Sequence, residues 1–203
     1  MTGERSEALF VEYLEREGLQ YERDYYIGPG NVDFRVHMGP LVVFSDVKEV
    51  RDSAKGVAGN IDAETHIRSD LRKLRRKFGA HAPQIPCLLV TMNFSRKFFT
   101  GLTVARAMHG EIGLTYDLVT RNRISELHHL PRANASSTKK QNTGISGIFV
   151  FDWRHADHWI FGNPFARYPV PTASFPKTKY MMVERSVGPH LVDLSRLMFF
   201  GRN

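Results

Sequence analysis

The sequence has little cysteine and no long apolar run, and both shortages restrict what the protein can be. Its single cysteine, Cys87, excludes a disulfide within the chain, and its place in an apolar segment predicts a small core residue. No apolar span is long enough to cross a membrane, and the N-terminal segment is not apolar, so we expect a cytoplasmic protein without a membrane partner.

Acidic residues are also in the minority. Lys and Arg number 28 against 21 Asp and Glu, which gives a formal net charge of +7 and a pI near 9.7. This balance favours a polyanionic partner, and nucleic acid is favoured over a membrane surface because no lipid-facing amphipathic helix is evident. Ribosomal and other basic proteins have similar values, so charge alone does not define a function.

Charged residues occur at the ends of two strand-like segments, where a globular protein gains little from placing them. Residues 31–36 alternate between apolar and polar side chains, the period of a half-buried strand, and Asp33 lies on the polar face. Residues 41–44 are continuously apolar, as in a strand buried on both faces, yet Asp46 and Lys48 follow directly. This polarity indicates a candidate hydrolytic site that depends on a metal ion.

The short connection between the two segments predicts an antiparallel hairpin. If Gly39 and Pro40 form the loop, Asp33 lies opposite Asp46, with Cβ atoms about 4.5–5.5 Å apart. Like charges at that distance repel each other unless they share a cation, and Mg²⁺ accepts carboxylate oxygens in this way. Lys48 is expected on the same face as Asp46 because side chains alternate along a strand.

Asp33 followed by Asp46-Val47-Lys48, after a helix that carries Glu7, resembles the PD-(D/E)xK nuclease superfamily, which has the restriction-endonuclease-like fold. The resemblance extends over residues 4–92 and implies an α/β fold with an αβββαβ core, in which helices flank a mixed β-sheet. Two positions depart from the family pattern. Val32 replaces the proline of the family name, and Asp46 replaces the commoner glutamate.

The resemblance implies an endonuclease that hydrolyses DNA with Mg²⁺, or with Mn²⁺ in its place. Asp33, Asp46, the Val47 carbonyl and Glu7 would hold the ion, and an acidic residue at the position of Glu7 often contacts it through water. Lys48 would orient the attacking water or neutralise the scissile phosphate. The lysine lies too close to carboxylates to serve easily as a neutral base, so we favour the electrostatic role.

Glu7 belongs to a predicted amphipathic helix over residues 4–17, which Gly18 would end. It lies at the edge of the apolar stripe of this helix, close enough to the core to reach a site. The alternative is a solvated carboxylate that complements the helix dipole.

A second amphipathic helix is predicted from about Asp62 to Phe78, with Gly79 as its stop. Its other faces carry the densest positive cluster of the chain, which consists of Arg68, Arg72, Lys73, Arg75, Arg76 and Lys77. Such a cluster is often only a solvated face. Because it follows the candidate site directly, we expect it to bind the phosphates of nucleic acid.

The rest of the chain is expected to extend one nuclease-like domain over residues 1–203, with a core at 4–120 and an extension at 121–203 that adds strands. We expect four elements beyond the second helix: a buried parallel strand (84–93), a helix (97–109), a strand (114–120) and a hairpin (145–152 with 159–161). Residues 131–144 are predicted to form a flexible loop.

Other residues offer weaker alternatives. His128 and His129, or His155, Asp157 and His158, contain ligand types for a metal but lack a zinc spacing. Phe149, Phe151, Trp153 and Trp159 could stack on bases, although their alternation favours packing. A catalytically inactive nucleic-acid-binding or assembly subunit and an RNA-directed nuclease remain alternative functions. A homodimer, or partner subunits of a multi-protein system, would be compatible with the sequence.

Overall fold

The computed structural model describes residues 3–27, 30–51, 63–78, 84–95, 101–109, 112–113, 128–129, 143–152, 157–171, 175, 178–185 and 192–200. The helices are α1 (Glu4–Arg16), α2 (Ala63–Phe78) and α3 (Gly101–His109). The strands are β1 (Gln20–Ile27), β2 (Gly30–Met38), β3 (Leu41–Val50), β4 (Cys87–Asn93), β5 (Ile112–Gly113), β6 (His128–His129), β7 (Gly147–Asp152), β8 (Asp157–Gly162), β9 (Lys179–Arg185) and β10 (Val192–Phe200).

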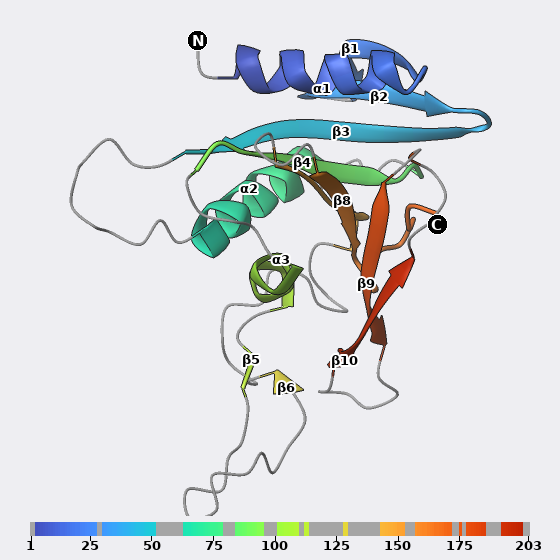
Figure 1. The fold of residues 1–203 in the computed structure, drawn as a ribbon. Coiled ribbons are helices and arrows are strands. Elements are labelled where there is room, and N and C mark those ends of the chain that lie inside the picture. The colour runs from blue at the N-terminus through green and yellow to red at the C-terminus, as the bar shows by residue number, and fades with distance from the viewer. Residues whose placement is uncertain are drawn as a thin grey trace, which may run out of the picture.

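The main sheet has eight strands in the order β1-β2-β3-β4-β7-β8-β9-β10, and β5 pairs with β6 separately. The pairs β3–β4, β4–β7 and β8–β9 are parallel, whereas the other neighbours in the main sheet are antiparallel. The predicted fold class is therefore confirmed: a mixed sheet flanked by helices, with the order αβββαβ from α1 to β4 and further strands near the C-terminus (Figure 1).

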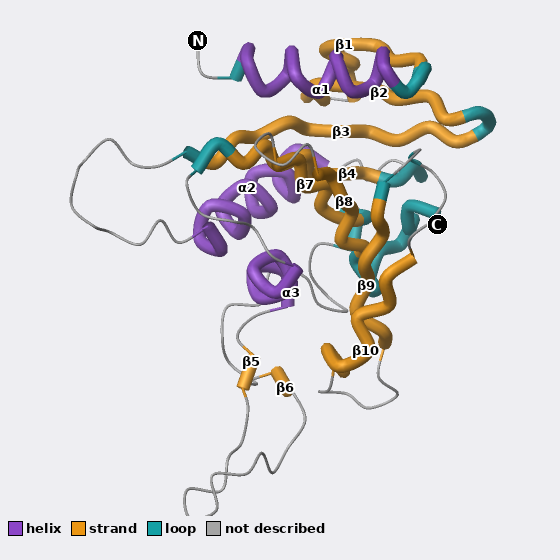
Figure 2. The backbone as a smooth tube through the Cα atoms, viewed as in Figure 1, coloured by secondary structure: helices purple, strands orange, loops and turns teal. Residues whose placement is uncertain are grey.

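Helices α1 and α2 cover opposite faces of the sheet, and strands lie between them (Figure 2). On one face, the apolar side of α1, including Phe10 and Leu14, belongs to the same buried cluster as Phe34 of β2. On the other, the predicted apolar stripe of α2 is buried with Phe44 of β3. Alternation along β3 therefore directs Asp46 toward the α2 side, as it does Phe44.

Two glycines have local roles in this framework. Gly18 follows α1 with a φ of +66°, a left-handed conformation that suits glycine, and so ends the helix as the sequence predicts. Gly147 lies where β7 and β8 approach closely, because a Cβ atom there would come within 2.6 Å of the Phe161 carbonyl oxygen.

Several predicted elements agree with the observed ones. The buried strand at 84–93 corresponds to β4, parallel to β3, and the predicted late hairpin corresponds to the antiparallel pair β7–β8. The predicted helix at 97–109 corresponds to α3, which begins at Gly101. The predicted strand at 114–120, the stop at Gly79 and residues 131–142 of the predicted loop lie outside the described residues.

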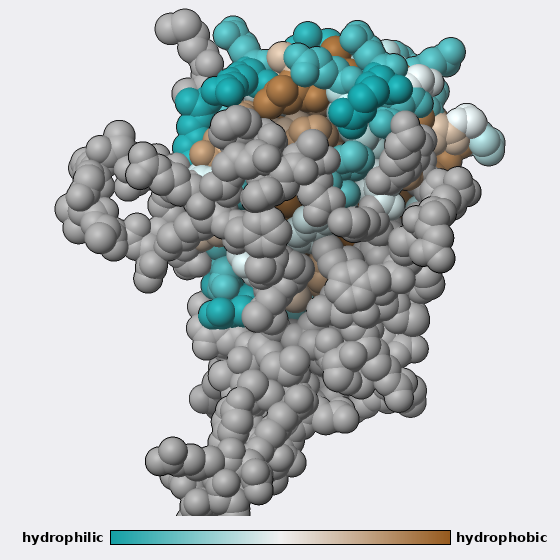
Figure 3. Space-filling view, in the orientation of Figure 1, coloured by the Kyte–Doolittle hydropathy of each residue, from teal (hydrophilic) through white to brown (hydrophobic). Residues whose placement is uncertain are grey.

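The exposed surface near α1 and β1 is mainly hydrophilic, with a few hydrophobic residues between the polar ones (Figure 3). None of the described helices combines the length and the apolar character that a membrane crossing requires.

Candidate functional site

The hairpin of β2 and β3 has the predicted register. The pairs run from Met38 opposite Leu41 to Phe34 opposite Ser45, around a turn in which Gly39 has a φ of +62°. Continued by one step, this register brings Asp33 beside Asp46, so the two carboxylates meet on adjacent strands.

Next to the pair Phe34 and Ser45, β2 and β3 are joined by a hydrogen bond to a side chain. The amide N–H of Val47 donates a hydrogen bond of 2.7 Å to Oδ2 of Asp33. The carboxylate of Asp33 is thereby fixed against β3 rather than free to rotate into solvent.

Two ammonium groups each bridge the two carboxylates. Lys48 Nζ lies 2.8 Å from Oδ2 of Asp46 and 3.5 Å from Oδ2 of Asp33. Lys77 reaches the same pair from α2: its Nζ pairs with Oδ1 of Asp46 and lies 3.8 Å from Oδ1 of Asp33. The pair of acids is thus compensated by two cations, one from the strand and one from the helix.

Burial makes these charges interact strongly. The side chain of Asp46 is 4% exposed and that of Asp33 is 18% exposed. Burial raises the pKa of Asp33, and the charge of Asp46 raises it further, against opposing effects of Lys48, the Val47 amide and Lys77. The site therefore favours any cation that lets both carboxylates stay ionised.

Lys48 is held in its charged form. Burial alone would lower the pKa of its ammonium, but the charge of Asp46, a hydrogen bond to Asp46 and the charge of Asp33 outweigh burial and raise it. Lys48 also donates a hydrogen bond of 3.0 Å to the Val47 carbonyl. Because its pKa is raised, Lys48 carries a positive charge at neutral pH and is a poor proton acceptor.

The oxygen atoms at this position suit a hard divalent cation. Two carboxylates and the Val47 carbonyl face the Lys48 ammonium, and oxygen ligands of these types are what Mg²⁺ uses while it keeps several waters. The described residues contain no group of three or more His, Cys, Asp or Glu side chains that could hold a metal ion. Water or substrate oxygens would therefore have to complete the coordination.

Glu7 lies apart from the paired carboxylates. It is on α1, on the sheet face opposite α2, and its Oε2 accepts a bond of 2.8 Å from Arg23 of β1. Among the described residues this arginine is the charged partner of Glu7. The structure does not bring Glu7 into contact with Asp33 or Asp46, and its role as a metal ligand stays a prediction.

The predicted basic cluster on α2 divides into three groups. Arg72, Lys73, Arg75 and Arg76 are exposed, and only Lys73 among these four pairs with a described acid, Asp70 at 2.9 Å. Lys77 instead turns toward the carboxylates.

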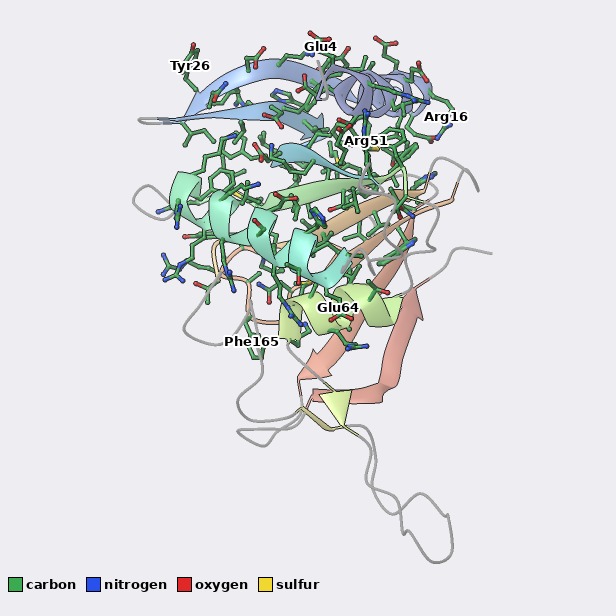
Figure 4. All side chains as sticks on the ribbon, turned by 90° about the vertical axis from the view of Figure 1, so that its left-hand side faces the viewer. Glu4, Arg16, Tyr26, Arg51, Glu64 and Phe165 are labelled. Carbon is green, nitrogen blue, oxygen red and sulfur yellow. The ribbon has the colours of Figure 1, made fainter. Side chains whose placement is uncertain are left out.

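Arg68 forms the third group because it is buried. Its guanidinium lies 3.4 Å from Glu64 and donates to the Arg106 carbonyl of α3 at 3.1 Å. Glu64, at the start of α2, lies beside α3 (Figure 4) and also pairs with Arg106 at 3.1 Å. Arg68 thus connects α2 to α3, which differs from the exposed phosphate-binding position that the sequence suggests.

No pattern in the sequence indicates Thr91 as a site residue. It is paired in register with Lys48 across β3 and β4, on the side of the sheet that α2 covers, and is 1% exposed. Its hydroxyl has no hydrogen-bond partner in the described part of the chain. A buried unpaired hydroxyl beside a charged site is unusual. Every residue of β4 is buried, so burial does not distinguish Thr91, and its register with β3 is what places it beside Lys48.

The residues that the sequence offers as alternative metal ligands or base-stacking groups are either buried in the core or have no described side chain. Phe149, Phe151 and Trp159 are buried, which confirms core packing over base stacking. His158 is also buried, with its ring 4.9 Å from that of Tyr13. His128, His129 and Asp157 have described backbones but no described side chains, whereas Trp153 and His155 fall outside the described residues.

Comparison with known proteins gives no family assignment. No protein-family model and no curated protein matches the sequence. One solved structure, SfsA from Pyrococcus furiosus in complex with Ca²⁺, aligns at 10% identity over 95% of this chain with a TM-score of 0.24. The chain spans 58% of the length of that protein. The case for the site therefore rests on its own geometry.

Proposed function

We propose that this protein is a metal-dependent endonuclease that hydrolyses phosphodiester bonds of DNA through two carboxylates and a lysine. One observation carries the proposal: the Lys48 ammonium bridges Asp33 and Asp46 at the point where β2 and β3 pair. Such a cluster of buried charges is costly for a fold unless it serves a purpose.

Asp33, Asp46 and the Val47 carbonyl are the residues that would hold Mg²⁺, or Mn²⁺ in its place. When bound, the ion supplies Lewis acidity and lowers the pKa of its water. The amide of Val47 keeps the Asp33 carboxylate in position for this task. Glu7 is retained as a candidate ligand acting through water, which requires that its carboxylate be released from Arg23.

Lys48 provides a fixed positive charge beside the carboxylates. Its raised pKa keeps it protonated at neutral pH, so we assign it to neutralising the scissile phosphate or orienting the attacking water. Contacts to Asp46 and to the Val47 carbonyl hold the ammonium in place before substrate arrives.

The exposed cations of α2 would bind the DNA backbone on the same side of the sheet as the carboxylates. Arg72, Arg75 and Arg76 have no ion-pair partner among the described residues, and guanidinium groups suit phosphate oxygens well. The net charge of +7 adds a general attraction for a polyanion. Assembly as a homodimer, or with partner subunits, is compatible with this mode of binding.

The proposal is tested by incubating the purified protein with supercoiled, linear and single-stranded DNA and with RNA, each in Mg²⁺, Mn²⁺ or EDTA. We expect nicking of DNA in the presence of either metal and none in EDTA. A shift of DNA in a gel without any cleavage would favour a nucleic-acid-binding or assembly subunit instead. Cleavage of RNA alone would favour an RNA-directed nuclease.

A further inference from the structure

We propose that Lys77 is a displaceable cation of the site, whose ammonium must leave the carboxylates before a divalent ion can bind there. The inference rests on the proposed function, because it concerns the same metal position. Its observation is separate: a lysine from α2 contacts both acids, in addition to the lysine of β3.

The four carboxylate oxygens are divided between the two lysines. Lys48 contacts Oδ2 of both acids, and the Val47 amide also donates to Oδ2 of Asp33. Lys77 contacts Oδ1 of both acids, and no other described residue is bonded to those two atoms. Lys77 therefore lies at the pair of oxygens that remains for a shared metal ion.

The two lysines also differ in how firmly they are held. Lys48 has a third partner, the Val47 carbonyl, and it extends from a central strand of the sheet. Lys77 is in the last turn of α2, and the two acids are its only charged partners among the described residues, with no carbonyl contact beside them. A flexible four-carbon side chain in that position can move its ammonium outward without moving the helix.

Charge balance favours the release of one ammonium group when a divalent ion binds. Two carboxylates and two ammonium groups sum to zero, so a divalent ion added to the intact cluster would make it strongly positive in a partly buried place. Release of Lys77 reduces that excess. Lys73 is one turn earlier on α2, so the released Lys77 ammonium would lie on the same side of the helix as Lys73. There it could contact a phosphate group of the nucleic acid.

The consequence is that Lys77 lowers the apparent metal affinity, because only the fraction of molecules with Lys77 displaced can bind the ion. Calorimetric titration with Mn²⁺ tests this in the wild type, Lys77→Met, Lys73→Met and Asp46→Asn. We expect Lys77→Met to bind Mn²⁺ roughly tenfold more tightly than the wild type. Lys73→Met is the matched control on the same helix and should bind like the wild type.

The outcomes separate this inference from the proposed function. If the wild type binds Mn²⁺ and Asp46→Asn does not, but Lys77→Met binds no more tightly, the displacement is wrong while the metal site stands. If none of the folded proteins binds Mn²⁺, the metal site and the displacement both fail.

A measurement on the unmutated protein covers the case in which Lys77→Met does not fold. Lysines are labelled with an amine-reactive acetylating reagent, with and without saturating Mn²⁺, and quantified by mass spectrometry. We expect Mn²⁺ to increase the labelling of Lys77 severalfold and to leave Lys73 unchanged. Labelling of Lys77 that stays constant or falls when Mn²⁺ is added would overturn the inference.

Discussion

The amide of Val47 donates a hydrogen bond of 2.7 Å to the Asp33 side chain, so a carboxylate of β2 is the acceptor for a buried backbone donor of β3. Asparagine at position 33 keeps an acceptor oxygen, whereas alanine leaves the amide unsatisfied. We predict that Asp33→Ala has a free energy of unfolding about 1–2 kcal/mol below that of Asp33→Asn. Urea denaturation in EDTA measures the difference, and equal stabilities would show that the bond contributes nothing.

The raised pKa of Asp33 predicts how stability depends on pH in the metal-free protein. Burial and Asp46 raise the pKa in the folded state above its ordinary value of 3.8. The folded protein therefore binds the Asp33 proton more tightly than the unfolded chain does. The stability that this proton contributes is fully present below the pKa of Asp33 in the unfolded chain, and it is lost as pH rises through the pKa of Asp33 in the folded protein. Asp33→Asn lacks this loss, so we expect its stability relative to the wild type to increase between pH 4 and pH 7. A relative decrease over that interval would contradict the assigned direction.

The exposed arginines of α2 should account for part of the DNA affinity. We predict that Arg72→Ala with Arg76→Ala weakens binding and reduces the slope of log affinity against log salt by up to about 1.8, or about 0.9 per phosphate contact. Arg16→Ala, an exposed arginine on α1, is the control and should leave the slope unchanged. Fluorescence anisotropy over a salt series gives both values. An equal effect per charge removed on α2 and on α1 would indicate attraction by net charge alone.

Cys87 should be unreactive in the native protein. Burial raises the pKa of its thiol to about 12, so little thiolate is present at pH 8. We expect a thiol-specific colorimetric reagent to react slowly with the native protein and rapidly in concentrated urea. As the chain has one cysteine, the signal needs no correction for other thiols. Fast native reaction would place Cys87 outside the core.

Gly147→Ala should destabilise the fold where β7 meets β8. A methyl group there would lie 2.6 Å from the Phe161 carbonyl, which is part of the backbone and cannot move aside cheaply. We expect a loss of about 1–3 kcal/mol in the free energy of unfolding, the range for overpacked cores. Gly30→Ala is the control because, among the described residues, its methyl group would meet only the Lys77 side chain, at 3.6 Å. Thermal denaturation compares the two, and a tolerated Gly147→Ala would contradict the close pairing.

The sequence was sufficient for the hairpin because alternation and a short loop leave few registers. A slip of one residue would have exchanged the buried and exposed faces of β2, so the apolar pattern and the position of Asp33 are coupled. The same reasoning placed Lys48 beside Asp46.

The helical residues were harder to assign because a basic run does not show which way each side chain points. Lys77 lies at the margin of the buried stripe and turns to the sheet, whereas Arg72 and Arg76 face outward. Arg68 is buried because α3 supplies a carbonyl acceptor, and the position of α3 depends on packing that no local pattern encodes. The sequence predicts the helix that carries Glu7 and the place of Glu7 at the edge of the apolar stripe, but not its pairing with Arg23.

The most direct test of the account is metal-dependent nicking of supercoiled DNA by the wild type, Asp46→Asn and Lys48→Met, with folding verified by circular dichroism. We predict nicking by the wild type in Mg²⁺ and a loss of at least about 100-fold in rate for each variant, because each removes a charge that the site requires. Nicking by Asp46→Asn and Lys48→Met at the wild-type rate would contradict the assignment of the site.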